Sequence, residues 1–221
     1  MNRTEILKSL HLSTSAYRDI QPYTRFPLTD VIDNHTAGVH CYLRRYQDIL
    51  LVTFRGTCSW KEWMSNLTFW KKTIPYDNME TKIRVHTGFL NAYKNEVRDK
   101  ILAAITDETN IIRISGHSRG AALAVLCAVD IQYNFPERDI ETILFGCPRV
   151  GNKEFAKSYN KRVNKTIRVE NSNDIITKIP LPIMGYRHVG AKVHIGTPRL
   201  PLYFSANDHY PHKYLGNLLK K

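Results

Sequence analysis

The stretch ISGHSRGAALAV, residues 114–125, places Ser118 at the centre of a Gly-x-Ser-x-Gly pattern between Gly116 and Gly120. A short apolar run at residues 111–115 precedes the pattern, and an Ala- and Leu-rich run follows it. The bare pattern occurs by chance in about one chain of this length in fifteen. A strand that turns sharply into a helix at a serine is, however, the context that an activated nucleophile requires. We therefore predict a nucleophilic Ser118, with an ordinary glycine-containing strand–helix junction as the alternative.

Strand and helix patterns alternate on both sides of this stretch. Apolar runs predict strands at residues 38–46, 49–55, 111–115, 140–146, 166–170 and 189–195. Helical spacing of apolar residues predicts helices at residues 88–106, 119–132 and 152–162. The alternation predicts an α/β domain with a central, mostly parallel sheet that carries its site at the carboxyl ends of the strands.

Composition and charge narrow the function classes. The 221 residues are 43% hydrophobic and 24% charged, which suits one globular domain over residues 1–221. The net charge of +12 favours a polyanionic partner, either nucleic acid or an anionic lipid surface, although a merely basic surface would also explain it. The basic residues form no run of five or six, so we do not expect nucleic-acid binding.

The cysteines and the beginning of the sequence bear on cofactors and compartment. Cys41, Cys58, Cys127 and Cys147 form no Cys-x-x-Cys pair, so a zinc site or redox motif is not predicted. We expect no metal and no organic cofactor. The first seventeen residues contain no apolar run of signal-peptide length, and no segment has the ~20 apolar residues of a spanning helix. We therefore expect free thiols and a cytoplasmic or membrane-peripheral location.

A serine nucleophile needs a histidine base and an acid that orients this base. In α/β-hydrolases both follow the serine, in the order acid and then histidine. Asp174 lies in a polar loop after the predicted strand 166–170 and is the best acid. Asp208 competes with it, but it is adjacent to His209, where its carboxylate is poorly placed to reach that ring.

Four histidines come late enough to act as the base: His188, His194, His209 and His212. His209 and His212 lie in a polar loop before a short apolar C-terminal helix, which suits a base carried after the last strand. Position alone does not separate these two.

Several segments resemble one family, the class 3 lipases of the fungal triacylglycerol lipase type. The resemblance extends from about Tyr17 to Tyr214 with agreeing order and spacing. The matching segments are LLVTFRGT (50–57), WMSNLTF (63–69), KIRVHTGFLNAY (82–93), ISGHSRGAALAVLCAVDI (114–131), FGCPRVGNKEFA (145–156), RVENSNDIITKIP (168–180) and GYRHVG (185–190). The resemblance implies an α/β-hydrolase fold and hydrolysis of lipid acyl esters.

The resemblance also implies roles for single residues. Ser118 corresponds to the nucleophile and Asp174 to the triad acid. His209 corresponds to the base, because the family often has Asp-His followed five residues later by Tyr, which here is Tyr214. The oxyanion hole corresponds to Thr57, through its backbone and hydroxyl, and to the backbone N–H of Arg119.

Three positions depart from the family pattern. Arg119 replaces the usual Leu after the serine, Ala121 replaces a Gly, and Asn66 replaces an acid. None of them is a triad position. The backbone N–H of Arg119 can serve an oxyanion whatever its side chain, and the guanidinium needs either a carboxylate partner or an anionic head group.

The resemblance assigns residues 58–70 to a lid over the site. Trp60, Trp63 and Leu67 share one face at helical spacing, which predicts a short amphipathic helix. We expect Trp60 on the exposed lid face, because tryptophan favours lipid interfaces, and we expect Trp63 and Leu67 to pack inward. The lysine pair at 71–72 would favour an anionic lipid surface.

The sequence thus predicts a serine lipase or esterase whose substrate is a lipid ester, with triacylglycerol, monoacylglycerol and phospholipid all open. We expect transient contact with a membrane or lipid interface, favoured where it is anionic. The alternative is a catalytically silent lipase-like protein that binds lipid or another protein. The presence of all three triad residue types argues against that alternative.

Overall fold

A computed structural model describes residues 3–18, 27–34, 39–56, 70–75, 80–199 and 203–220. A seven-stranded sheet has the order β1-β2-β3-β6-β7-β8-β9. Its strands are β1 (Leu28–Asn34), β2 (Val39–Tyr46), β3 (Ile49–Phe54), β6 (Ile111–His117), β7 (Asp139–Phe145), β8 (Lys165–Asn171) and β9 (Ala191–Ile195). A separate two-stranded sheet pairs β4 (Lys71–Thr73) with β5 (Arg84–His86).

The main sheet is mostly parallel, as predicted. β1, β2 and β3 pair antiparallel, whereas β3, β6, β7, β8 and β9 pair parallel in turn. The parallel strands therefore end at one common edge of the sheet. β6 ends there at His117, directly before Ser118, and β8 ends there at Asn171, three residues before Asp174.

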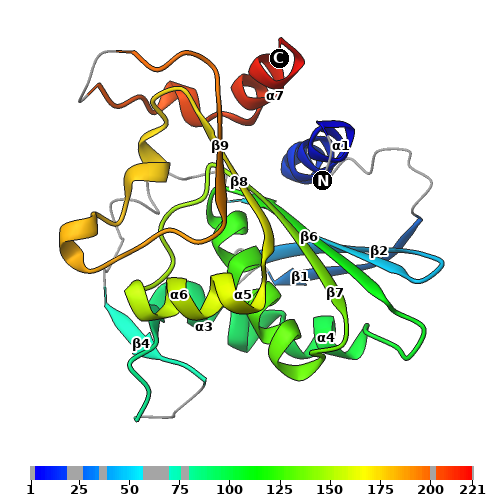
Figure 1. Cartoon of the computed structure of the whole chain (residues 1–221). Coiled ribbons are helices and arrows are strands. Elements are labelled where there is room, and N and C mark those ends of the chain that lie inside the picture. The colour runs from blue at the N-terminus through cyan, green and yellow to red at the C-terminus, as the bar shows by residue number, and fades with distance from the viewer. Residues whose placement is uncertain are drawn as a thin grey trace.

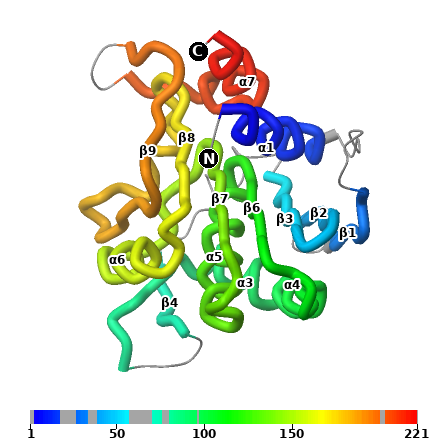
Figure 2. The backbone as a smooth tube through the Cα atoms, turned by 45° about the vertical axis from the view of Figure 1, so that its right-hand side comes forward, coloured from blue at the N-terminus to red at the C-terminus, as the bar shows by residue number. Residues whose placement is uncertain are grey.

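Helices cover both faces of the sheet. One face carries α3 (Thr87–Glu96), α4 (Arg98–Ala103), α5 (Arg119–Asn134) and α6 (Lys153–Arg162). The opposite face carries α1 (Arg3–Ser15), which continues into the 3₁₀ turn η1 (Ala16–Arg18), and α7 (Pro211–Leu219). Figures 1 and 2 both show α1 beside α7, and Arg3 Nη2 donates to the carbonyl of Leu218 at 2.9 Å.

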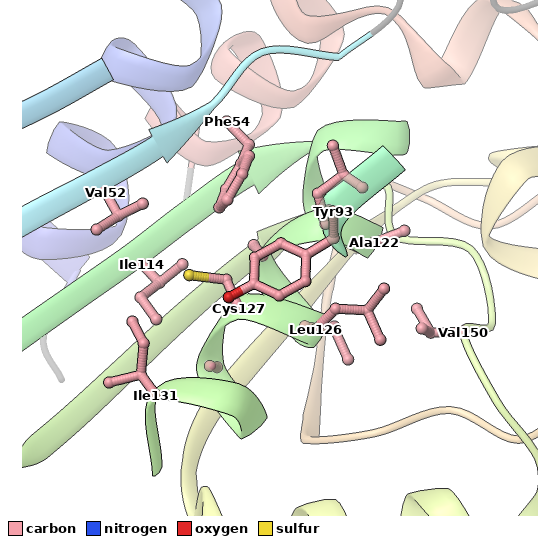
Figure 3. Close-up of a cluster of buried hydrophobic side chains, with 14 of the residues drawn as sticks. Val52, Phe54, Tyr93, Ile114, Ala122, Leu126, Cys127, Ile131 and Val150 are labelled. Carbon is pink, nitrogen blue, oxygen red and sulfur yellow. The ribbon is translucent and has the colours of Figure 1, made fainter. Parts of the chain in front are cut away.

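Each sheet face packs its own core, because alternate residues of a strand point to opposite faces. Ile112, Ile114 and Leu144 pack against α3 and α5. Figure 3 shows this cluster, in which Phe54 from β3 and Tyr93 from α3 meet side chains of α5. Ile143, Phe145 and Val169 belong to the second core, under α1 and α7. Both faces are buried, which explains why these strands have continuous apolar sequences.

The strands and helices predicted outside the lid segment are present with shifted ends. The helix expected over 88–106 is two helices, α3 and α4, because the backbone at Val97 leaves the helical region at φ −132° and ψ −20°. The strand expected at 111–115 continues to His117, since its register with β7 extends that far. No sequence pattern described above predicts α1, β1, β4 or β5.

The structure describes three of the four cysteines and allows a search of its helices for a membrane-spanning length. Cys41, Cys127 and Cys147 are buried free thiols, in agreement with the sequence prediction. In the part of the chain that the structure describes, no helix has the length and apolar character needed to span a bilayer.

Candidate active site

The chain bends sharply at Ser118, between β6 and α5. Ser118 has φ 60° and ψ −129°, an unusual conformation for a residue with a side chain, and its N–H donates to the carbonyl of Phe145 at 2.9 Å. The two flanking glycines allow this bend. A Cβ on Gly116 would lie 2.5 Å from Gly120, and a Cβ on Gly120 would lie 2.6 Å from the carbonyl oxygen of Arg55. Steric exclusion therefore requires glycine at both positions of the pattern.

The three predicted triad residues meet in one hydrogen-bonded chain. His209 Nε2 lies 2.8 Å from Ser118 Oγ, and His209 Nδ1 lies 2.8 Å from Asp174 Oδ2. A carboxylate accepts, so Nδ1 carries the proton and Nε2 accepts from the serine hydroxyl. All three residues are almost completely buried. This is the geometry in which a histidine takes a proton from a serine and an acid fixes the histidine tautomer.

Asp174 is fixed by donors besides the histidine. The N–H of Ile176 donates to Oδ1 at 2.8 Å, and Tyr214 Oη donates to Oδ2 at 2.5 Å. Burial, and then the Asp174 carboxylate, raise the pKa of Tyr214 well above its usual value, so the phenol keeps its proton and remains a donor. The family spacing singles out Tyr214 in the sequence, but its role as a donor to Asp174 emerges only from the structure.

Gly146 makes room for the histidine–aspartate pair. It follows β7 with φ +55°, in the left-handed region. A Cβ there would lie 2.9 Å from His209 Cε1 and 3.1 Å from Asp174 Oδ2. Gly146 is not among the predicted site residues, although its position at the end of a predicted strand, in FGCPRVG, is a signal for it.

A buried charge network holds the loop that carries Asp174. Glu170 accepts from Arg168 and from Lys178, the latter at 2.8 Å. His188 Nε2 donates to the carbonyl of Thr177 at 2.8 Å, and burial, followed by the charge of Arg168, lowers the pKa of His188 to about 2. His188 is therefore neutral and structural, and it is not the base.

The remaining competitors are placed elsewhere, and His194 lies within strand β9. Asp208 accepts from Arg199 at 2.6 and 2.7 Å and from the N–H of Asn173 at 3.1 Å. The ring of His212 stacks on Tyr210, with 5.7 Å between ring centroids. The geometry thus distinguishes His209 from His212, which position in the sequence had not done.

The structure describes only some of the residues predicted to form the oxyanion hole and the lid. Arg119 is the first residue of α5, so its backbone N–H lies at the helix N-terminus, the end of a helix that favours anions. Its guanidinium is partly buried, and burial lowers its pKa. Thr57, Trp60, Trp63 and Leu67 lie outside the described residues, as does all of the predicted lid except Trp70, which is 77% exposed.

The described part of the chain offers no cluster of metal-ligating side chains. No group of three or more His, Cys, Asp or Glu side chains is arranged there to hold a metal ion.

Comparisons with known proteins all identify lipases or phospholipases as similar to this chain. Residues 51–184 match the family model described as Lipase (class 3). A chloroplastic phospholipase A(1) of Arabidopsis thaliana is 36% identical over 59% of this chain and 33% of its own length. The secreted mono- and diacylglycerol lipase 1 of Fusarium solani is 28% identical over 84% of this chain and 56% of its own length. The chain thus spans about one third to just over half of these relatives.

Solved structures share the fold. The triacylglyceride lipase of Rhizomucor miehei matches with a TM-score of 0.81 at 22% identity, over 93% of this chain and 92% of that one. A triacylglycerol lipase whose catalytic centre is formed by a serine protease triad matches with a TM-score of 0.78 at 24% identity. The match covers 87% of this chain and 79% of that one. At these identities the likeness shows an α/β-hydrolase fold.

Proposed function

Because this chain belongs to the class 3 lipase family, we propose that it is a carboxylic ester hydrolase that cleaves the acyl esters of lipids through an acyl-Ser118 intermediate. One observation carries the proposal, the continuous hydrogen-bonded chain from Ser118 through His209 to Asp174. The buried, pre-aligned serine and histidine provide the activation that a serine hydroxyl lacks by itself.

The geometry supports a two-stage reaction. Ser118 Oγ attacks the ester carbonyl carbon while His209 Nε2 takes the hydroxyl proton, and Asp174 stabilises the imidazolium that forms. The N–H of Arg119, together with Thr57 by family resemblance, stabilises the oxyanion. His209 then gives its proton to the leaving alcohol as the C–O bond breaks. Water attacks the acyl-serine with its proton going to His209, and the fatty acid leaves as the proton returns to Ser118.

Substitution of the nucleophile tests this reaction. We expect Ser118→Ala to lower the hydrolysis of p-nitrophenyl esters by at least about 10³-fold, because no other group replaces the hydroxyl. The matched control is Ser13→Ala, at a buried serine of α1 outside the site. Retention of wild-type activity in Ser118→Ala would contradict the proposal.

A fluorophosphonate probe separates an enzyme from a catalytically silent relative. The probe labels a serine only where a base activates it, so wild-type protein should be labelled and Ser118→Ala should not. Folded wild-type protein that stays unlabelled would favour a lipid- or protein-binding role.

We propose that the substrate is a glycerolipid ester, because the relatives are phospholipases, mono- and diacylglycerol lipases and lipases. A panel of triacylglycerol, monoacylglycerol and phospholipid, with Ser118→Ala as the blank, assigns the head group.

We further propose that the molecule contacts an anionic lipid surface through the segment around Asp174 and the loop before His209. Residues 175–206 contain no acidic residue and four basic ones, namely Lys178, Arg187, Lys192 and Arg199. Lys178 pairs with Glu170 and Arg199 pairs with Asp208, so Arg187 and Lys192 carry most of the attraction for anionic head groups. Large apolar side chains in this segment are exposed, namely Leu181, Ile183, Tyr203 and Phe204, with Ile183 at 91%. Apolar side chains among cations suit a surface whose head groups are negative.

Vesicle sedimentation tests this contact. We expect binding to vesicles that contain anionic lipid to exceed binding to neutral vesicles, and we expect Tyr203→Ser to weaken it several-fold. The matched control is Tyr133→Ser, because Tyr133 is 59% exposed near the far end of α5. Equal loss in both variants, or equal binding to neutral and anionic vesicles, would contradict the proposal.

A further inference from the structure

His117, the residue before the nucleophile, contacts the base directly. It is the last residue of β6 and is 1% exposed. Its Nε2 lies 2.8 Å from the backbone carbonyl oxygen of His209. A carbonyl oxygen can only accept, so Nε2 carries the proton and donates. His117 therefore holds the main chain of the residue whose side chain takes the serine proton.

The other ring nitrogen of His117 is occupied by Tyr17. Tyr17 Oη lies 2.8 Å from Nδ1. Burial, and then the neighbouring His209, lower the pKa of His117 well below its usual value, so the ring is neutral and Nδ1 is a lone pair. The phenol must then donate to it. The opposite tautomer would set the Nε2 lone pair against the carbonyl of His209, so only one arrangement satisfies all of these atoms.

The two histidine rings also face each other. Their centroids are 4.6 Å apart, and the ring planes are tilted by 31°. His209 becomes an imidazolium during the proposed reaction, and a positive charge on His117 at this distance would oppose that proton transfer. The hydroxyl of Tyr17 stabilises the uncharged form of His117, because it donates to the lone pair that a proton would occupy.

Tyr17 lies on the face of the sheet opposite to the face that α5 covers. It lies in η1, at the end of α1, which runs beside α7 in Figures 1 and 2. Its hydroxyl packs against Gly56, where a Cβ would lie 1.8 Å from Tyr17 Oη. Gly56 directly precedes Thr57, the predicted oxyanion residue. One phenol thus contacts both the residue before the nucleophile and the residue before the oxyanion position.

We propose that Tyr17 and His117 are positioning residues, which fix the main chain of His209 and keep an uncharged ring beside the catalytic base. This role rests on the proposed ester hydrolysis. Neither residue touches the reacting atoms, so their loss should impair the chemical step and leave substrate binding in place.

Kinetics on the full chain test the role. We expect Tyr17→Phe to lower kcat about tenfold and His117→Leu about a hundredfold, with KM within about twofold, because a slightly displaced base loses the aligned geometry. His117→Gln keeps an amide N–H near the position of Nε2 and should recover most of the activity. The matched control is Tyr159→Phe, which removes the buried hydroxyl that contacts Thr166 at 3.0 Å and should leave kcat unchanged.

Histidine NMR decides the point independently of turnover. With isotope-labelled histidine, the ring signals of His117 should not titrate between about pH 5 and 8. The signals of His209 should move in Tyr17→Phe and not in Tyr159→Phe. If the fluorophosphonate never labels wild-type protein, the proposed hydrolysis fails, and these signals still test the positioning role. The proposal is overturned if the His209 signals and kcat in Tyr17→Phe match those in Tyr159→Phe.

Discussion

At the scale of single residues, the site depends on glycines that have no Cβ at crowded positions. Gly116, Gly120 and Gly146 each occupy a position where a Cβ would lie within 3 Å of another atom. Interior packing has no room for such an overlap, so these glycines determine where the triad side chains can lie.

Gly146→Ala should therefore reduce both stability and activity. The left-handed backbone costs an alanine about 1–2 kcal/mol, and the new methyl pushes against the His209 ring, which should lower kcat about a hundredfold. Unfolding in urea and ester hydrolysis measure the two effects.

The matched control is Gly185→Ala. Gly185 has a similar φ of +76°, but its nearest neighbour is the Lys71 amine at 3.9 Å, so it has the backbone cost without the collision. If both variants keep the same kcat, the collision with His209 is unimportant.

The triad could be predicted from residue types and their order, supported by the family segments. Ser118, Asp174 and His209 follow strands in the right sequence, and the parallel sheet brings strand ends together. The contact of Tyr214 with Asp174 and the contact of Tyr17 with His117 could not be predicted, because each joins segments that are separated in the chain. No local pattern encodes such a contact.

At the scale of elements, two loops at the carboxyl edge of the sheet are fastened to each other. Asp208 accepts from Arg199 and from the N–H of Asn173, while the Asn173 side chain donates to the carbonyl of Tyr203 at 2.6 Å. Asp174 pairs with Ser205 in the same place. The loop with the acid and the loop before the base thus form one unit, which keeps the distance from Asp174 to His209 fixed.

Asp208→Ala should loosen this unit. The substitution removes the carboxylate that accepts from the N–H of Asn173 and from the Arg199 guanidinium. We therefore expect a loss of about 1–3 kcal/mol in unfolding free energy and a several-fold fall in kcat. Urea titration and ester hydrolysis measure this.

Asp130→Ala is the comparison for that variant. Asp130 is also a buried, Arg-paired acid, but it lies on α5 and binds Tyr93 and Arg98 away from the triad. It should lose stability without losing kcat per folded molecule. A similar fall in kcat for both variants would argue against a link between the two loops.

The element boundaries illustrate what a sequence pattern omits. The apolar spacing over residues 88–106 is helical throughout, yet the chain breaks at Val97, because helix spacing reports a buried face and not the continuity of the backbone. β1 was missed because its residues are mainly exposed and polar, which suits an edge strand paired on one side only.

At the scale of the whole molecule, buried neutral histidines make stability depend on pH. Burial is the first cause that lowers the pKa of His188 to about 2 and of His86 to about 4. Below pH 6.5 the unfolded chain binds protons at these rings and the folded chain does not. Stability is therefore complete above that pH and is lost as the pH falls, by about 1.4 kcal/mol per pH unit for each ring.

His188→Gln should make this dependence shallower. Glutamine keeps an N–H donor for the carbonyl of Thr177 and has no titrating group. The unfolded variant therefore binds one proton fewer at acidic pH than the unfolded wild-type chain does, and the slope of stability against pH decreases. Urea unfolding between about pH 5 and 7.5 measures the slope, with His11→Gln on the exposed side of α1 as the control. An unchanged slope in His188→Gln would show that this ring is not linked to folding.

The position of Tyr17 has a consequence for how the molecule folds. Tyr17 stands near one end of the chain and Tyr214 near the other, and both contact residues of the same site. The first contact joins residues 100 positions apart and the second joins residues 40 positions apart. The site therefore forms only when these non-local contacts close, and non-local contacts slow folding. Catalytic competence should appear after the helices and the sheet have formed, so that recovery of activity on refolding lags behind recovery of secondary structure.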